Sequence, residues 1–167
     1  DASGNVVTTT AYTPNTDGTL ADKTDANAHK TLYSYTTNGD LWKVTTPNGR
    51  VTEFGYNAYG ALTSRKDALL RQTTFSLDEW NRLVGINYPT GTDPTFSYDG
   101  ENNLTGWGDA QGSWARTYDN AGRLTAESRG GVTEVSYGYD AVGKKGLLST
   151  LTDIDGRVVT YSYTDRN

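Results

Sequence analysis

The 167 residues carry 15 Lys and Arg against 20 Asp and Glu, giving a net charge of −5, with one His and no Cys. This balance argues against nucleic acid or an anionic membrane as partner, and the missing cysteines exclude disulfides and thiolate metal sites. The 12 Tyr, 4 Trp, 3 Phe and 19 Gly favour strands and turns, although hydrophobic residues are only 34%.

The length predicts one domain, and no apolar stretch approaches the roughly 18 residues of a membrane span. The chain begins at Asp1, lacks Met throughout and shows no signal peptide. We therefore expect it to be a piece of a longer protein or a processed chain.

The aromatic residues follow a period of about 21 residues. Of the 15 Tyr and Phe residues, 13 lie at position zero or position two of this repeat, where roughly one or two would fall by chance. The spacings are 21, 21, 21, 21, 20, 21 and 24 residues. The predicted units begin at Tyr12, Tyr33, Phe54, Phe75, Phe96, Arg116, Tyr137 and Tyr161.

Each unit predicts two short antiparallel strands. Side chains two residues apart point to the same face of a strand, so the two aromatics of a unit share one face. A Leu at position eight lies in the returning strand, across from these aromatics. The strand residues expected to hold the array together are Tyr33, Tyr35, Leu41, Phe54, Tyr56, Leu62, Phe75, Leu83, Phe96, Tyr98, Leu104, Tyr118, Leu124, Tyr137, Tyr139, Tyr161 and Tyr163.

A tight turn separates the two strands of a unit. Asp or Asn at position three, with Gly or Asn three residues later, is typical of a type I turn closed by a left-handed residue, which makes a three-residue hairpin loop with a bulge. Asn81 and Asn102 replace Gly because Asn tolerates the left-handed conformation. The other turn residues assigned to the repeat are Gly39, Gly60, Asp78, Asp99, Asp119, Gly122, Asp140 and Gly143.

A second turn follows near positions 13 to 16 and leads into the next unit. It is predicted at 46–50, 89–93, 109–113, 128–132 and 153–157. The whole chain, residues 1–167, is therefore predicted to be all-β, a single array of about eight repeated antiparallel hairpins. Three extra residues are expected around Gly143 to Gly146.

The repeated motif resembles the Rhs/YD-repeat family. "YSYTTNGDL", "FGYNAYGAL" and "YDNAGRL" are close to the family pattern YxYDxxGRL, and Tyr98-Asp99, Tyr118-Asp119 and Tyr139-Asp140 supply the paired residues. The resemblance covers about residues 12 to 167.

The resemblance implies a curved or spiralling sheet that forms part of a larger β-shell, similar to bacterial Rhs proteins, the C component of Tc toxins and animal teneurins. Such shells enclose a C-terminal toxin domain and are delivered by type VI secretion or within a secreted toxin complex. It further implies export from a bacterium after a cytoplasmic stage, or a place at the cell surface. The implied partners are the remainder of the shell and an enclosed toxin domain.

No catalytic site is predicted. The Tyr-Asp pairs could be read as carboxylates beside phenols, but repetition at a fixed period favours turn capping, because an active site does not need seven copies. His29 is the single His, and no G-x-S-x-G nucleophile motif is present. Asp153, Asp155 and Gly156 resemble part of a calcium loop but lack its further ligands, so we expect a hairpin turn and no cofactor or metal.

Four tryptophans lie outside the repeat: Trp42, Trp80, Trp107 and Trp114. They could stack on sugar rings at an exposed face, although packing between strands is favoured. An exposed module that recognises carbohydrate or a cell-surface protein is therefore the alternative to a shell segment. The free sheet edges predict self-association of the isolated chain.

Overall fold

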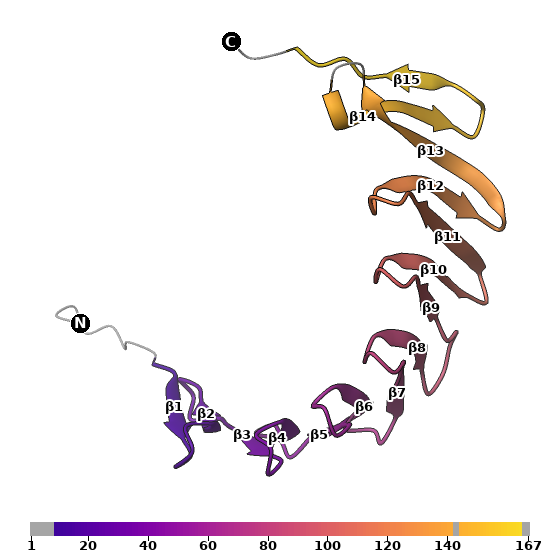
Figure 1. Cartoon of the computed structure of the whole chain (residues 1–167). Coiled ribbons are helices and arrows are strands. Elements are labelled where there is room, and N and C mark those ends of the chain that lie inside the picture. The colour runs from indigo at the N-terminus through magenta and orange to yellow at the C-terminus, as the bar shows by residue number, and fades with distance from the viewer. Residues whose placement is uncertain (1–8, 142–143, 165–167) are drawn as a thin grey trace. The chain divides into compact units, whose positions relative to one another are not determined.

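The computed structural model describes residues 9–141 and 144–164, and these contain strands and turns without any helix (Figure 1). No segment within that part of the chain could therefore cross a membrane as a helix. The expected all-β, repetitive antiparallel strip is confirmed. The strands are β1 (Ala11–Pro14), β2 (Leu20–Thr24), β3 (Lys30–Tyr35), β4 (Leu41–Thr45), β5 (Val51–Tyr56), β6 (Leu62–Lys66), β7 (Gln72–Leu77), β8 (Leu83–Asn87), β9 (Thr95–Tyr98), β10 (Leu104–Asp109), β11 (Gly112–Tyr118), β12 (Leu124–Arg129), β13 (Val132–Ala141), β14 (Lys144–Asp153) and β15 (Val158–Thr160).

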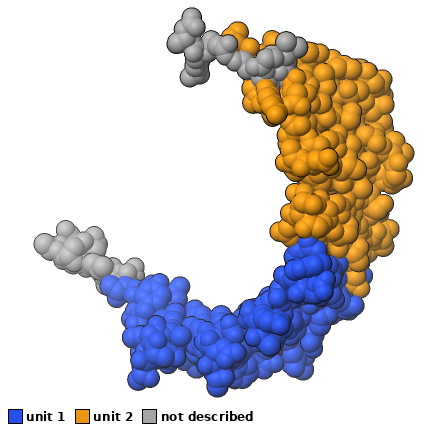
Figure 2. All heavy atoms as spheres, in the orientation of Figure 1, with its two compact units in different colours: residues 1–91 blue, residues 92–167 orange. Residues whose placement is uncertain are grey.

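The chain divides into two compact units, residues 1–91 and residues 92–167, coloured blue and orange in Figure 2. In the first unit, β1 to β8 form a meander in which each strand pairs antiparallel with the next. In the second unit, β9 to β15 do the same. Every hydrogen-bonded strand pair within a unit is thus a local hairpin.

The predicted turns within the repeats adopt the expected geometry. In the loop from Thr36 to Asp40, the amide of Gly39 donates to the Thr36 carbonyl at 3.0 Å and the amide of Thr36 donates to the Asp40 carbonyl at 2.8 Å. Gly39 has a φ of 88°, in the left-handed region that an L side chain rarely enters. Asn81 and Asn102 take the same place with φ of 61° and 71°, which confirms their expected role.

Two of the second turns, at the opposite ends of the strands, were predicted by the period alone and not by any turn residue. Loops 25–29 and 67–71 have the same pair of main-chain hydrogen bonds as the glycine-containing loops. Their left-handed residues are Ala28, with φ of 64°, and Leu70, with φ of 62°. Neither residue type signals a left-handed turn, so pattern reading passes over them. The Asp that opens each loop holds this conformation, since its Oδ1 accepts two main-chain amide hydrogens of the loop.

A β-bulge recurs in every hairpin that carries a position-two residue. Tyr35 pairs with Leu41 while Ser34 pairs with Lys43, so Trp42 is an extra residue on the returning strand. The bulged strand bends there and one carbonyl leaves the regular ladder. The same irregularity follows Leu20, Leu62, Leu83, Leu104, Leu124 and Leu148.

The two faces of the sheet differ in composition and burial. Along β11, Trp114, Arg116 and Tyr118 are half-buried, whereas the alternating Ser113 and Thr117 are exposed. We call the first the aromatic face and the second the small-residue face. Among the described residues no large side chain is fully buried, and the only buried polar residue is Asp22. The strip is one layer thick, and its apolar contacts lie along the aromatic face.

The hairpin of β13 and β14 differs from the others. Tyr139 pairs with Leu148 and the strands continue to the pair of Ala141 and Lys144, so the extra residues lengthen this hairpin. Asp140 lies inside β13 with a φ of 65°, instead of opening a three-residue loop. Gly143, predicted as the turn glycine, lies outside the described residues.

Candidate functional site

The structure places the predicted repeat residues in equivalent positions of successive hairpins. In every hairpin except that of β13 and β14, the position-two residue ends the first strand and the leucine begins the second. Tyr33 and Tyr35 lie in β3, Leu41 in β4, Phe54 and Tyr56 in β5, Leu62 in β6, Phe75 in β7, Leu83 in β8, Phe96 and Tyr98 in β9, Leu104 in β10, Tyr118 in β11, Leu124 in β12, Tyr137 and Tyr139 in β13, with Tyr161 and Tyr163 after β15.

A tyrosine–leucine contact joins neighbouring hairpins. The phenol of Tyr56 donates to the main-chain carbonyl of Leu41 in the preceding hairpin at 2.7 Å. Leu41 pairs with Tyr35 in β3 but has no partner in β5, because the pairs between β4 and β5 end at Lys43, beyond the bulge. The same contact joins Tyr118 to Leu104 at 3.0 Å, Tyr139 to Leu124 at 2.8 Å and Tyr163 to Leu148 at 2.9 Å.

Each of these four phenols is occupied by a main-chain carbonyl. Burial, with the nearby charge of Asp40, raises the pKa of Tyr56 above its ordinary value. A phenol that is protonated and already donating to a carbonyl is a poor general base.

The carboxylates that open the loops cap the main chain. Asp119 Oδ1 accepts the amide hydrogens of Ala121 at 2.9 Å and Arg123 at 3.0 Å, and Oδ2 accepts Arg123 Nε at 2.7 Å. The main-chain bond from Arg123, followed by its side-chain bond, lowers the pKa of Asp119. The carboxylate is saturated with donors and ionised, which fits turn capping and not acid catalysis. Asp78 and Asp99 accept main-chain hydrogens in the same way.

Side chains also join consecutive loops along one edge of each unit. Asn57 Nδ2 donates to Asn81 Oδ1 at 2.6 Å in the first unit. In the second unit Arg123 Nη1 donates to Asp140 Oδ1 at 3.1 Å, and its guanidinium lies 4.5 Å from the ring centroid of Tyr139. Neighbouring repeats are therefore held together both at the strands and at the loops.

The position-zero row contains one charged residue, Arg116. It pairs across the strands with Glu127, and Arg116 Nε donates to Glu127 Oε1 at 2.9 Å. Tyr137 donates to Glu127 Oε2 at 2.9 Å, so the arginine replaces an aromatic without breaking the row. Arg116 first, then Tyr137, lowers the pKa of Glu127.

The four tryptophans are divided equally between the two units. Trp107 and Trp114 pair across β10 and β11, with ring centroids 6.1 Å apart and planes 3° apart. Arg116 lies over Trp107 and Arg129 over Trp114, at 4.9 Å and 5.4 Å from the ring centroids. In the first unit Trp42 is 38% exposed and Trp80 is 67% exposed.

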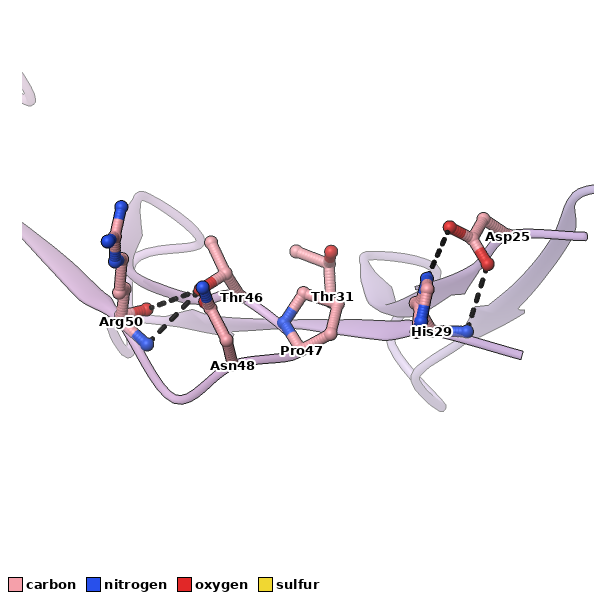
Figure 3. Close-up of a pocket in the computed structure, with 7 residues that line it drawn as sticks. All are labelled: Asp25, His29, Thr31, Thr46, Pro47, Asn48 and Arg50. Atoms are coloured by element: carbon pink, nitrogen blue, oxygen red, sulfur yellow. Dashed lines mark hydrogen bonds and ion pairs between the residues drawn. The ribbon is translucent and has the colours of Figure 1, made fainter. Parts of the chain in front are cut away.

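A shallow depression lies between loops 25–29 and 46–50 of the first unit, with a volume of about 700 Å³. Figure 3 shows its lining residues, Asp25, His29, Thr31, Thr46, Pro47, Asn48 and Arg50. His29 Nδ1 lies 3.1 Å from Asp25 Oδ2, and the bond is a donation from the ring because an ionised carboxylate can only accept. The sequence pattern did not assign this depression.

No constellation for metal binding is present in residues 9–141 and 144–164. The one buried carboxylate there, Asp22, accepts from Lys30 Nζ at 3.1 Å and from Thr13 Oγ1 at 3.1 Å. The bond from Lys30 is the main cause that lowers the pKa of Asp22. Asp22 therefore supports the sheet as an ionised, paired group.

The repeated hairpins match a known family. The model of the RHS repeat matches residues 35–72, 56–93 and 98–133, which together make up more than half of the chain. The chain belongs to the RHS repeat family. No curated protein sequence matches it.

Three solved structures show where the same fold as in these RHS repeats recurs. A chain in the Photorhabdus luminescens Tc holotoxin pore is 18% identical with a TM-score of 0.65, over 86% of this chain and 9% of that one. A chain in the crystal structure of TcdB2-TccC3-Cdc42 is 19% identical, with a TM-score of 0.67, over 89% and 9%. A chain in TcdB2-TccC3 without the hypervariable C-terminal region is 16% identical, with a TM-score of 0.66, over 94% and 10%.

At these identities the likeness is one of fold. The RHS repeats described here span about a tenth of the length of each matched chain.

Proposed function

We propose that this chain is a structural, non-catalytic segment of a larger shell that encloses a C-terminal toxin domain and helps to deliver it. The observation that carries the proposal is the tyrosine–leucine contact, which joins one hairpin to the next without a second layer. A strip built in this way can be extended by adding hairpins, since each addition buries its own aromatic residues against the previous one.

The proposal includes the division into about eight units and the structural role of the aromatic, leucine and turn-glycine rows. It is supported by the position of these residues in successive hairpins. It is also supported by carboxylates that are taken up in turn capping, as at Asp119. Such a segment would act by steric enclosure and not by chemistry.

The delivery route and the compartment belong to the same proposal. The fold recurs in a Tc holotoxin pore and in TcdB2-TccC3 structures. We therefore propose a bacterial protein exported as part of a toxin, through a Tc-type complex or type VI secretion, after a cytoplasmic stage.

Cysteine labelling of the two faces tests enclosure, because these 167 residues contain no Cys. Arg65 and Ser76 are both exposed, and they lie on opposite faces. Arg65 pairs with Phe54 on the aromatic face, and Ser76 pairs with Gly85 on the small-residue face. Arg65→Cys and Ser76→Cys should be introduced separately into the complete protein that contains this segment.

In a closed shell, a polymer-linked maleimide is expected to react with only one of the two cysteines, and with both after unfolding in urea. A protease should likewise spare the C-terminal domain until the shell is unfolded. Equal reaction of both cysteines in the native protein, with rapid digestion of the C-terminal domain, would contradict enclosure.

The exposure of Trp80 and Trp42 favours a second candidate, a module that binds carbohydrate or a cell-surface protein. Trp80→Ala and Trp42→Ala variants of the complete protein should then lose binding to a glycan array or to target cells. Under the shell proposal the same variants keep whatever binding the protein has.

A further inference from the structure

Each three-residue loop is flanked by one residue on either side, which gives a five-residue segment. The fifth residue of this segment is often an arginine that pairs with an aspartate at the first. Arg71 Nη2 lies 2.7 Å from Asp67 Oδ2, and Arg123 Nη2 lies 2.7 Å from Asp119 Oδ2. The pairs Arg82–Asp78 and Arg157–Asp153 have the same spacing in the sequence. In these loops the guanidinium is therefore occupied by its own loop.

Loop 46–50 breaks this rule because its first residue is Thr46. The Thr46 hydroxyl still caps the loop as an aspartate would, since Oγ1 accepts the Arg50 amide hydrogen at 3.1 Å. The same hydroxyl donates to Asn48 Oδ1 at 2.6 Å. The loop thus keeps its shape without a carboxylate. The exposed Arg50 guanidinium makes no hydrogen bond or ion pair with any residue that the structure describes.

This guanidinium lies at the depression between loops 25–29 and 46–50. In the view of Figure 3, Arg50 and His29 lie at opposite ends, with Thr31 and Pro47 between them. His29 occupies the loop position that arginine has elsewhere, and its Nδ1 is bonded to Asp25. The ring atom left to meet a ligand is Nε2. The volume of about 700 Å³ is in the range of small-molecule sites.

The surroundings favour a compact ligand over a peptide strand. The two loops connect β2 to β3 and β4 to β5, and all four strands are already paired with their neighbours within the first unit. An extended peptide would therefore find no free strand edge there to pair with. Hydroxyl and amide groups of Thr31 and Asn48 instead suit a polyhydroxylated molecule.

We infer that this depression binds a small carboxylate-bearing sugar, with the carboxylate on Arg50 and the sugar extending along Pro47 and Thr31 toward His29. A guanidinium binds a planar carboxylate through two parallel hydrogen bonds, so an unpaired arginine is matched to this group. The Pro47 ring supplies an apolar surface for the sugar ring. The inference does not depend on the proposed shell.

Arginine footprinting tests the site in the full chain, with glucuronate as the probe. Phenylglyoxal modifies accessible guanidinium groups, and mass spectrometry assigns the modified residue. Arg50 is expected to react faster than the paired Arg71, and glucuronate is expected to slow Arg50 alone. Acetate should protect Arg50 more weakly, and glucose should not protect it.

Two variants separate the roles of the two ends. Thr46→Asp restores the aspartate of the other loops, so it should pair with Arg50 and weaken glucuronate binding about tenfold or more, the loss expected for a charge-assisted hydrogen bond. His29→Ala should weaken glucuronate binding but leave acetate protection unchanged. Arg71→Ala, at the same loop position, should change neither.

Three outcomes would overturn the inference. Equal rates of phenylglyoxal reaction at Arg50 and Arg71 would show that the Arg50 guanidinium is no more available than a paired one. Protection by acetate equal to that by glucuronate would reduce the site to a bare anion contact. Protection by a glutamate-rich peptide, but not by glucuronate, would replace the sugar with a protein partner.

Discussion

The phenol of Tyr56 donates a 2.7 Å hydrogen bond to the carbonyl of Leu41, fifteen residues earlier and one hairpin back. Each partner is positioned by the local structure of its own hairpin. The pairs between β4 and β5 end at Lys43, so Leu41 has no strand partner on that side, and the end of β5 places the Tyr56 phenol against its carbonyl.

Tyr56→Phe should therefore destabilise the first unit by about 1 kcal/mol, since it leaves a partly buried carbonyl without its donor. Urea unfolding of the variant measures the change, and hydrogen exchange should increase at β4 and β5. Tyr59→Phe is the matched control, because Tyr59 is 84% exposed in the adjoining loop and should unfold as the native chain does. A Tyr56→Phe variant as stable as Tyr59→Phe would refute the role of the contact.

Leu70→Gly should stabilise the chain by roughly 0.5–1 kcal/mol. Leu70 holds a φ of 62°, which is unfavourable for an L side chain, and 74% of its surface is exposed, so little packing is lost. Leu69→Gly is the control, as Leu69 is 72% exposed and its φ is not positive. The midpoint temperature of thermal unfolding should be higher for Leu70→Gly than for the native chain, and lower for Leu69→Gly. The reverse order would show that the left-handed conformation carries no strain.

Acid should weaken the array through its turn carboxylates. Hydrogen bonds to the folded loops lower the pKa of Asp67, chiefly through the Arg71 side chain, and of Asp119, chiefly through the Arg123 main chain. A carboxylate with a lowered folded-state pKa contributes stability above its ordinary value of 3.8, and this contribution is lost as pH falls through the folded value. The urea concentration at the unfolding midpoint should therefore decrease as the pH is lowered below about 4.

In the Asp119→Asn variant, the urea midpoint should decrease less steeply below about pH 4 than in the native chain. Glu134→Gln should not change this decrease, because the Glu134 side chain is exposed and makes no hydrogen bond or ion pair within the described part of the chain. If the urea midpoints of the two variants decreased equally with acid, the acid sensitivity would have to come from other groups.

The isolated chain should self-associate through strand β15. Within the described residues β15 pairs on one side only, with β14, and Val158 and Val159 are 57% and 51% exposed. Size-exclusion chromatography with light scattering, coupled to far-UV circular dichroism, should show a β-rich oligomer. Val159→Lys should shift it toward monomer, whereas Ala115→Lys, on an internal strand, should not. A compact β-rich monomer of the native chain would favour the independent binding module.

Much of the fold could be predicted from local chemistry. Asp119 and Gly122 mark their turn because the carboxylate caps amides and glycine accepts a left-handed φ. Leu70 does not indicate its turn in the sequence, since its left-handed conformation is held by the loop around it and not by its residue type. Leu148 was missed as a member of the leucine row because the inserted residues moved it from the expected position at Lys145.

The sites were less predictable than the strands. The link from Tyr56 to Leu41 depends on a bulge, and a bulge has no residue signature here, since Trp42 and Thr63 both occupy it. The free Arg50 has a signal that could have been read. Four loops have Asp and Arg four residues apart, and Thr46 interrupts that rule.

The recurring bulge and the lengths of the turns together decide whether a repeat may be odd or even in length. From Tyr33 to Phe54 the step is 21 residues, an odd number, yet both rings lie on the aromatic face because one unpaired residue reverses the alternation once. From Tyr137 to Tyr161 the step is an even 24, and the pairs Tyr137–Leu151 and Leu151–Val159 still keep both rings on one face. This hairpin also has the bulge after Leu148, but it contains three extra residues, an odd number that offsets the bulge. Loss of a single residue from one repeat would turn every later ring to the opposite face, unless a turn or a bulge changed with it. Insertions and deletions in such an array are thus constrained by parity before they are constrained by side-chain chemistry.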